Sequence, residues 1–139
     1  GAGRSRLVGN FLGMRLMHSG YTVYVQGEIS TPSIREGDLL IVISGSGETT
    51  QLVSFANKAK SEKAKVVLIC SKSSSTIGDL ADKTIQIGTD SSFAPTKGMP
   101  MGTMFELSTL IFLEAIVSHL IHEKGIPEEE MKYRHANME

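Results

Sequence analysis

The chain has 139 residues, of which 40% are apolar, and its 14 basic and 15 acidic side chains nearly cancel. This length suits one domain with a substantial core, and the balanced charge excludes a global field favouring nucleic acid or an anionic membrane. The single cysteine, Cys70, excludes an intramolecular disulfide and fits a reducing compartment. We therefore expect one domain over residues 1–139 in a cytoplasmic protein.

The first half of the chain alternates helix-like and strand-like patterns. Apolar residues at three- and four-residue spacing predict a helix over residues 4–19, which Gly20 ends. The aromatic and β-branched residues 21–25 predict a strand, and the apolar run 39–43 predicts a buried one. A further amphipathic helix is expected over residues 50–63.

The second half continues the alternation and contains one long irregular segment. In chain order, the patterns predict a strand at 66–70, a short helix at 76–81, a weaker strand at 84–87, an irregular segment at 88–100, a long helix at 102–124 ended by Gly125, and a short acidic helix from Pro127. Irregular segments of that length in a compact domain are often functional.

Strands that alternate with helices predict a three-layer α/β/α sandwich with a mainly parallel sheet, of flavodoxin-like type. In such sheets, ligands bind beyond the carboxyl ends of the strands. The opening Gly1-Ala2-Gly3-Arg4-Ser5 is a turn-like cluster of the kind that normally follows a strand. We therefore expect the natural protein to begin earlier, with an N-terminal helix and a first strand that this chain lacks.

The most informative stretch is Ser44-Gly45-Ser46-Gly47-Glu48-Thr49, which follows the strand pattern of residues 39–43 and precedes a helix pattern. Glycines let backbone N–H groups converge, hydroxyls donate further hydrogen bonds, and the helix N-terminus supplies partial positive charge. Ordinary capping by Thr49 or Thr50 is the alternative. The loop lacks the lysine of a nucleoside-triphosphate loop, so the sequence favours a phosphate monoester as ligand.

Glu106 lies at the start of the long apolar helix, directly after the irregular segment. A carboxylate there can simply favour the helix dipole and face water. Both of its neighbours are apolar, however, and burial beside an anchored sugar phosphate would suit a general base. The residues alone leave these two interpretations open.

The other polar residues give weaker signals. His119 and His122 are three apart, but no third metal ligand stands out, so we expect no metal site. No nucleotide-binding motif is complete, and we expect no cofactor. His135 lies in a polar tail, where solvent exposure is the default.

These motifs together resemble a known family. The 44–49 loop, preceded by Gly3-Arg4-Ser5, resembles the phosphosugar loop of the sugar isomerase (SIS) domain family. The segment Pro100-Met101-Gly102-Thr103-Met104-Phe105-Glu106 and the ending Arg134-His135-Ala136-Asn137 resemble the 6-phospho-3-hexuloisomerase subgroup, as does Met14-Arg15-Leu16-Met17-His18. The likeness covers the whole chain.

The resemblance implies an isomerase that interconverts D-arabino-hex-3-ulose 6-phosphate and D-fructose 6-phosphate through an enediol, in ribulose-monophosphate formaldehyde fixation. It implies that the phosphate is held by Ser44, Gly45, Ser46, Gly47 and Thr49, and that Arg4 and Ser5 contact the phosphate or the sugar. Glu106 would be the base, and His135 would enter the site of a neighbouring subunit. The resemblance thus implies a homo-oligomer, expected to be a tetramer, with no nucleic acid or membrane as partner.

Two alternatives stay open at this point. One is another phosphosugar isomerase of the same family, acting on arabinose 5-phosphate, which is not expected to carry the 100–106 segment. The other is a non-catalytic module that senses a phosphosugar and needs neither a base nor a histidine from a neighbouring subunit.

Overall fold

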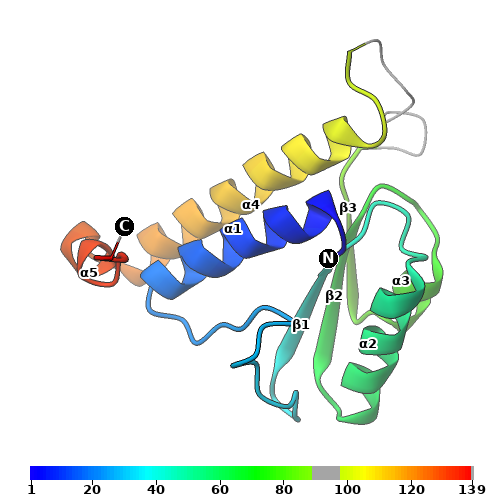
Figure 1. Ribbon diagram of the computed structural model, residues 1–139, viewed down its shortest axis with the longest axis horizontal. Coiled ribbons are helices and arrows are strands. Elements are labelled where there is room, and N and C mark those ends of the chain that lie inside the picture. Colours follow the sequence, from blue (N-terminus) through cyan, green and yellow to red (C-terminus); the bar gives the residue numbers. More distant parts are fainter. Residues whose placement is uncertain (89–97, 139) are drawn as a thin grey trace.

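The computed structural model describes residues 1–88 and 98–138 (Figure 1). Its elements follow in the order α1 (Arg4–His18), β1 (Leu39–Ile43), α2 (Thr50–Ser61), β2 (Lys65–Cys70), α3 (Thr76–Leu80), β3 (Lys83–Gln86), α4 (Thr103–Lys124) and α5 (Glu128–Tyr133). The three strands form one parallel sheet in the order β1-β2-β3. The predicted α/β/α architecture with a parallel sheet is confirmed.

The sheet separates two apolar clusters because alternate strand residues point to opposite faces. Val42, Val66 and Leu68 pack with α2 and α3 on one face. Ile43 and Ile69 pack with α1 and α4 on the other. Figure 1 shows α1 and α4 side by side, with their N-terminal ends at the same end of the molecule as the carboxyl ends of the strands.

Most helix ends lie where the turn chemistry predicts. Gly20 and Gly125 have positive φ and end α1 and α4, and in both cases the next N–H bonds back to a carbonyl five residues earlier. Helix α2 ends at Ser61, two residues before the predicted end, because Lys63 adopts the left-handed conformation (φ 60°) that a glycine usually supplies.

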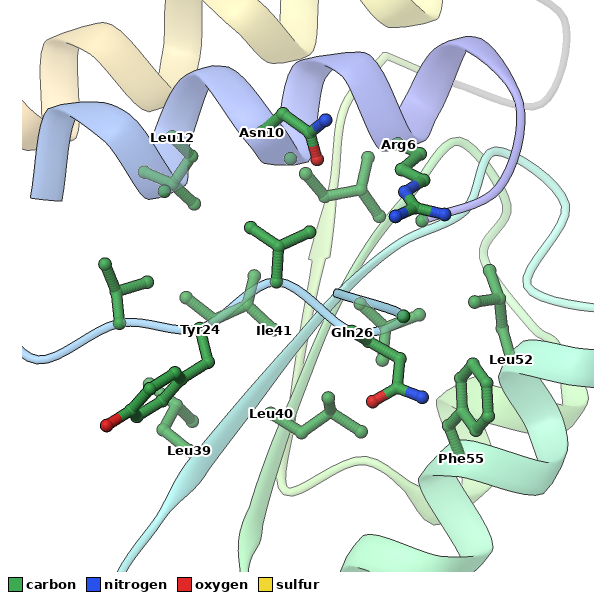
Figure 2. A pocket seen from close by; sticks show the side chains of 18 of the residues that line it. Arg6, Asn10, Leu12, Tyr24, Gln26, Leu39, Leu40, Ile41, Leu52 and Phe55 are labelled. Atoms are coloured by element: carbon green, nitrogen blue, oxygen red, sulfur yellow. The ribbon is translucent and has the colours of Figure 1, made fainter. Parts of the chain in front are cut away.

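The predicted strand at residues 21–25 is wrong. This segment pairs with no strand among residues 1–88 and 98–138, and the sheet ends at β1 on the side that faces it. Without a neighbouring strand to hydrogen-bond, its strand-forming residues do not form a strand. A groove of about 210 Å³ lies between the segment and β1, and Figure 2 shows Tyr24 and Gln26 of the segment lining it together with Leu39, Leu40 and Ile41 of β1. Helix α1 closes the groove with Asn10 and Leu12, and Leu52 and Phe55 of α2 complete its lining.

Helix α4 is long and apolar enough to cross a membrane by length and composition, and 22% of its apolar window is buried. The helix is nevertheless tied into the domain, because Phe105, Leu113 and Val117 belong to the core cluster beneath it. Arg15 of α1 also makes a two-pronged hydrogen bond to Glu114 at 3.1 and 2.7 Å.

Candidate functional site

The Ser44–Thr49 loop follows β1 and makes a compact turn at the carboxyl edge of the sheet. Its first residue continues the sheet, because the Ser44 N–H donates to the Ile69 carbonyl at 3.0 Å. The buried Ser44 hydroxyl then accepts from the Gly47 N–H at 3.1 Å. The exposed Ser46 hydroxyl accepts from the Glu48 N–H at 3.2 Å. The turn therefore brings serine hydroxyls and backbone amides together at one end of β1.

Both glycines of the loop lie close to neighbouring segments, and at Gly47 the surroundings require a glycine. A Cβ on Gly45 would lie 3.3 Å from the Phe105 ring at the start of α4. A Cβ on Gly47, which has φ 68°, would lie 2.2 Å from the Ser75 hydroxyl before α3. The loop backbone thus passes between the starts of α3 and α4, and it comes so close to Ser75 that a side chain at position 47 would not fit.

The loop ends at the N-terminus of helix α2, where capping by a threonine was the alternative to anion binding. Thr49 occupies the N-cap position, but its side chain makes no capping hydrogen bond within the described part of the chain. The first turn of α2 carries no acidic residue among those described. The partial positive charge of this helix end is therefore available to an anion beside the Thr49 hydroxyl.

Arg4 and Glu106, which the sequence singled out separately, are in contact. Arg4 Nε lies 2.8 Å from Glu106 Oε2, and the side chains are 49% and 18% exposed. Arg4 also donates to the Met101 carbonyl just before α4. Because Phe105 lies against Gly45, this ion pair stands next to the serine and glycine loop. Base candidate and anion loop thus share one edge of the sheet.

Ser5 lies in the first turn of α1, next to Arg4 and half-buried. Ser5 therefore lies at the carboxyl edge of the sheet, where helices α1, α2 and α4 all have their N-terminal ends. Each helix end adds partial positive charge, which favours a negatively charged group.

His135 lies elsewhere in the same chain. Its ring stacks on the His18 ring at the far end of α1, with the ring centroids 5.1 Å apart and the planes 20° from parallel. A fifteen-residue helix is about 20 Å long, so Arg4 and His135 are at opposite ends of it. Within one chain, the structure does not bring His135 to Glu106.

Among residues 1–88 and 98–138, no group of three or more His, Cys, Asp or Glu side chains is placed to hold a metal ion. Most of the irregular segment predicted at 88–100 lies outside the described residues, and only its ends are described.

Sequence reasoning missed the segment that supports the loop. Ser71 follows β2 as Ser44 follows β1, and both its N–H and its hydroxyl donate to the Gly45 carbonyl, at 3.0 and 2.8 Å. Its position at a strand carboxyl end was the available signal. Phe105 was missed as well, since nothing in the sequence shows that its ring packs against Gly45.

A parallel α/β sheet with a serine and glycine loop, three helix N-termini and a carboxylate at its carboxyl edge has the features of an α/β domain that binds a phosphate group at this edge. The SIS domain family matches residues 1–112, and the chain belongs to this family.

Named relatives place the chain more narrowly within the family. It is 52% identical to the 3-hexulose-6-phosphate isomerase of Methylomonas aminofaciens over 141 residues, which is 100% of this chain and 78% of the relative. It is 43% identical to the enzyme of that name from Bacillus subtilis, over 100% of this chain and 77% of the relative. A crystal structure from Methanococcus jannaschii, for which a 3-hexulose-6-phosphate isomerase function was inferred, superposes with a TM-score of 0.92 at 37% identity, covering 100% of this chain and 76% of that one.

Proposed function

We propose that this protein interconverts D-arabino-hex-3-ulose 6-phosphate and D-fructose 6-phosphate through an enediol. One observation carries the proposal: the Arg4–Glu106 pair, 2.8 Å apart, stands beside the Ser44–Thr49 loop in a chain 52% identical to a 3-hexulose-6-phosphate isomerase. The proposed pathway is ribulose-monophosphate formaldehyde fixation, and the proposed location is the cytoplasm.

The loop is the proposed phosphate anchor. Ser44, Ser46 and Thr49 would offer hydroxyls, and the amides of Gly45 and Gly47 would line the same turn. The arrangement supports this role because the turn is compact, glycine-dependent and set at a helix N-terminus. Binding energy gathered at the phosphate would then hold the reacting carbons in place.

Glu106 is the proposed base. Moving a carbonyl between neighbouring carbons requires removal of a proton from one carbon and its return to the next, which one carboxylate can do. Such a shift changes no overall oxidation state, so its chemistry needs no redox cofactor. Arg4, already bound to Glu106, would orient the carboxylate and face the developing negative charge on the enediol oxygen. Ser5 would contact the sugar or its phosphate.

A homo-oligomer, with a tetramer as the form implied by the family resemblance, is proposed to complete the site. The outer faces of α1 and α4 expose apolar residues at helical spacing, namely Leu7, Phe11 and Met14 on α1 and Leu107 and Ile111 on α4. A second copy would bury this stripe. Since His135 lies at the opposite end of α1 from Arg4, its proposed catalytic role requires entry into a neighbouring subunit's site.

The proposed domain covers residues 1–139. Helix α4 runs continuously from Thr103 to Lys124, past the matched region that ends at residue 112. Helix α5 then returns to the end of α1, where Arg134 donates to the His18 carbonyl at 3.4 Å.

A coupled assay tests the function. A synthase forms the hexulose phosphate from formaldehyde and ribulose 5-phosphate, and the appearance of fructose 6-phosphate is followed with and without this protein. Turnover supports the proposal. Turnover of arabinose 5-phosphate in its place would favour the other isomerase, and binding of the sugar phosphate without turnover would favour the sensing module.

A further inference from the structure

We propose that Glu48 is a positioning residue that fixes the phosphate loop to the start of α3 through Thr76. The inference rests on the proposed role of the Ser44–Thr49 loop and extends it to a residue outside the set of phosphate ligands. One Glu48 carboxylate oxygen accepts from the Thr76 N–H at 2.8 Å, and the other accepts from the Thr76 hydroxyl at 2.6 Å. The two contacts join parts of the chain that are 28 residues apart.

Residues 71–77, here called the support segment, also donate hydrogen bonds to two carbonyls of the loop. The Gly45 carbonyl accepts both bonds from Ser71, and the Gly47 carbonyl accepts from the Ile77 N–H at 3.1 Å. In a trans peptide, the C=O and the following N–H point in opposite directions. Anchoring the Gly45 carbonyl therefore turns the Ser46 N–H away from the support, toward the open side of the loop. Residues 71–77 thus set the direction of a loop amide.

A carboxylate beside a phosphate site would normally repel the ligand. Here both oxygens of Glu48 accept from Thr76, and the N-terminal end of α3 faces them. The hydroxyl and the N–H of Thr76 lower the pKa of Glu48, which favours the charged carboxylate. Charge-assisted hydrogen bonds of this kind are stronger than neutral ones. The N–H and O–H donors of Thr76 therefore offset part of the negative charge of Glu48.

Two pairs of variants test the contact. Glu48→Ala removes it, and Glu48→Gln keeps the shape and one acceptor. Thr76→Val removes the hydroxyl, and Thr76→Ser restores it. With fructose 6-phosphate as substrate, Glu48→Ala should raise KM about tenfold and leave kcat within about twofold, and Thr76→Val, which keeps the N–H contact, should raise KM by a smaller factor. Glu48→Gln should fall between, and Thr76→Ser should stay near the parent protein.

Competition by inorganic phosphate separates positioning from general stability. The inhibition constant for phosphate should rise in parallel with KM in Glu48→Ala. Glu62→Ala is the matched control, because Glu62 is a carboxylate hydrogen-bonded to Lys58 at the other end of α2. This control removes an exposed ion pair far from the loop and should leave both KM and the inhibition constant for phosphate unchanged. In Glu48→Ala/Thr76→Val, the two effects should not add, since both variants break the same contact.

Three outcomes would overturn the inference. If Ser46→Ala weakens phosphate binding and Glu48→Ala does not, Glu48 has no positioning role and the proposed phosphate loop stands. If neither variant changes phosphate binding or KM while turnover persists, the loop is not the phosphate site and the inference fails with it. A lower melting temperature of Glu48→Ala at unchanged KM would make Glu48 only a structural cap of α3.

Discussion

At the scale of single residues, the contact between Arg4 and Glu106 bears on the interpretation of Glu106. The sequence left Glu106 undecided between a solvent-facing carboxylate and a base. Its side chain is 18% exposed and bound to Arg4 beside the anion loop, which favours the second interpretation. No local pattern could predict this, because the two residues are far apart in the sequence and meet only when α1 and α4 pack together.

Glu106→Gln tests the base directly. The amide keeps the shape of the side chain and can still accept from Arg4 through its carbonyl oxygen, but it cannot take a proton. We expect kcat to fall by at least about a hundredfold, the usual contribution of a general base. The dissociation constant for fructose 6-phosphate, measured by calorimetry, should change little. Turnover close to that of the parent protein would remove Glu106 from the base role.

The lowered pKa of Glu48 predicts a pH dependence of stability. A carboxyl whose pKa is lowered by folding stabilises the folded state above its unfolded pKa, and this contribution is lost as the pH falls through the folded pKa. The melting temperature of the parent protein should therefore exceed that of Glu48→Gln by a constant amount above about pH 5, the upper end of the ordinary glutamate range. The difference should shrink at lower pH. A difference that grows on acidification would contradict the assignment.

At the scale of elements, the sequence predicted the patterns that depend on local chemistry. The strand runs at residues 39–43 and 66–70 and the glycine ends of α1 and α4 are confirmed. The failures lie where tertiary context decides. Residues 21–25 have strand-forming side chains but face an open groove, and Lys63 ends α2 in a conformation that its residue type does not favour.

Helix α4 has one hydroxyl group on the face that it buries against the core. Phe105, Thr109, Leu113 and Val117 recur every four residues, and all four are buried. The Thr109 hydroxyl finds no hydrogen-bond partner among residues 1–88 and 98–138. Leaving a buried hydroxyl unpaired costs about 1–3 kcal/mol.

Thr109→Val should therefore stabilise the protein. Valine keeps the branched shape and removes the unpaired oxygen, so we expect a gain of about 1 kcal/mol and a melting temperature a few degrees higher. Differential scanning calorimetry measures the change. Thr109→Ser is the control, because it keeps the hydroxyl and loses the methyl group, and it should destabilise. A lower melting temperature for Thr109→Val would show that the hydroxyl is satisfied.

At the scale of the whole molecule, the groove beside β1 lies along an edge of the sheet that could take a further strand. Leu39–Ile43 pairs on one side with β2, and its other edge faces the groove in the described part of the chain. Gly1 lines the groove as well, so a strand placed before it would run toward the carboxyl edge, parallel to β1. The chain spans about three quarters of the length of its relatives.

We expect a five-residue apolar strand fused before Gly1, matched in length to β1, to fill the groove. It would satisfy the open edge of β1 and could pair with residues 23–25 as well. Amide hydrogen exchange should then slow at Val23, Val25 and Ile41, and the melting temperature should rise. A fusion of equal length with alternating lysines is the control. Equal exchange rates in both fusions would exclude a strand at this position.

The separation of Glu106 and His135 within one chain leads to a prediction about how subunits share an active site. If His135 completes a neighbouring subunit's site, each active site takes Glu106 from one chain and His135 from another. Glu106→Gln and His135→Gln should then both be inactive alone. After the two are unfolded and refolded together, about a quarter of the sites should contain both intact residues by random pairing. The recovered activity, compared with that of the parent protein refolded alone, measures this fraction.

A variant in the exposed apolar faces of α1 and α4, the proposed subunit interface, is the matched control for that mixing experiment. Ile111 is 72% exposed on α4, so Ile111→Asp should leave the fold of one chain intact and place a charge in the proposed interface. Light scattering should show a smaller assembly, and the same mixture carrying Ile111→Asp should recover no activity. A mixture that stays inactive although the parent protein is oligomeric would confine His135 to its own chain, where it stacks on His18 about 20 Å from the Arg4 end of α1.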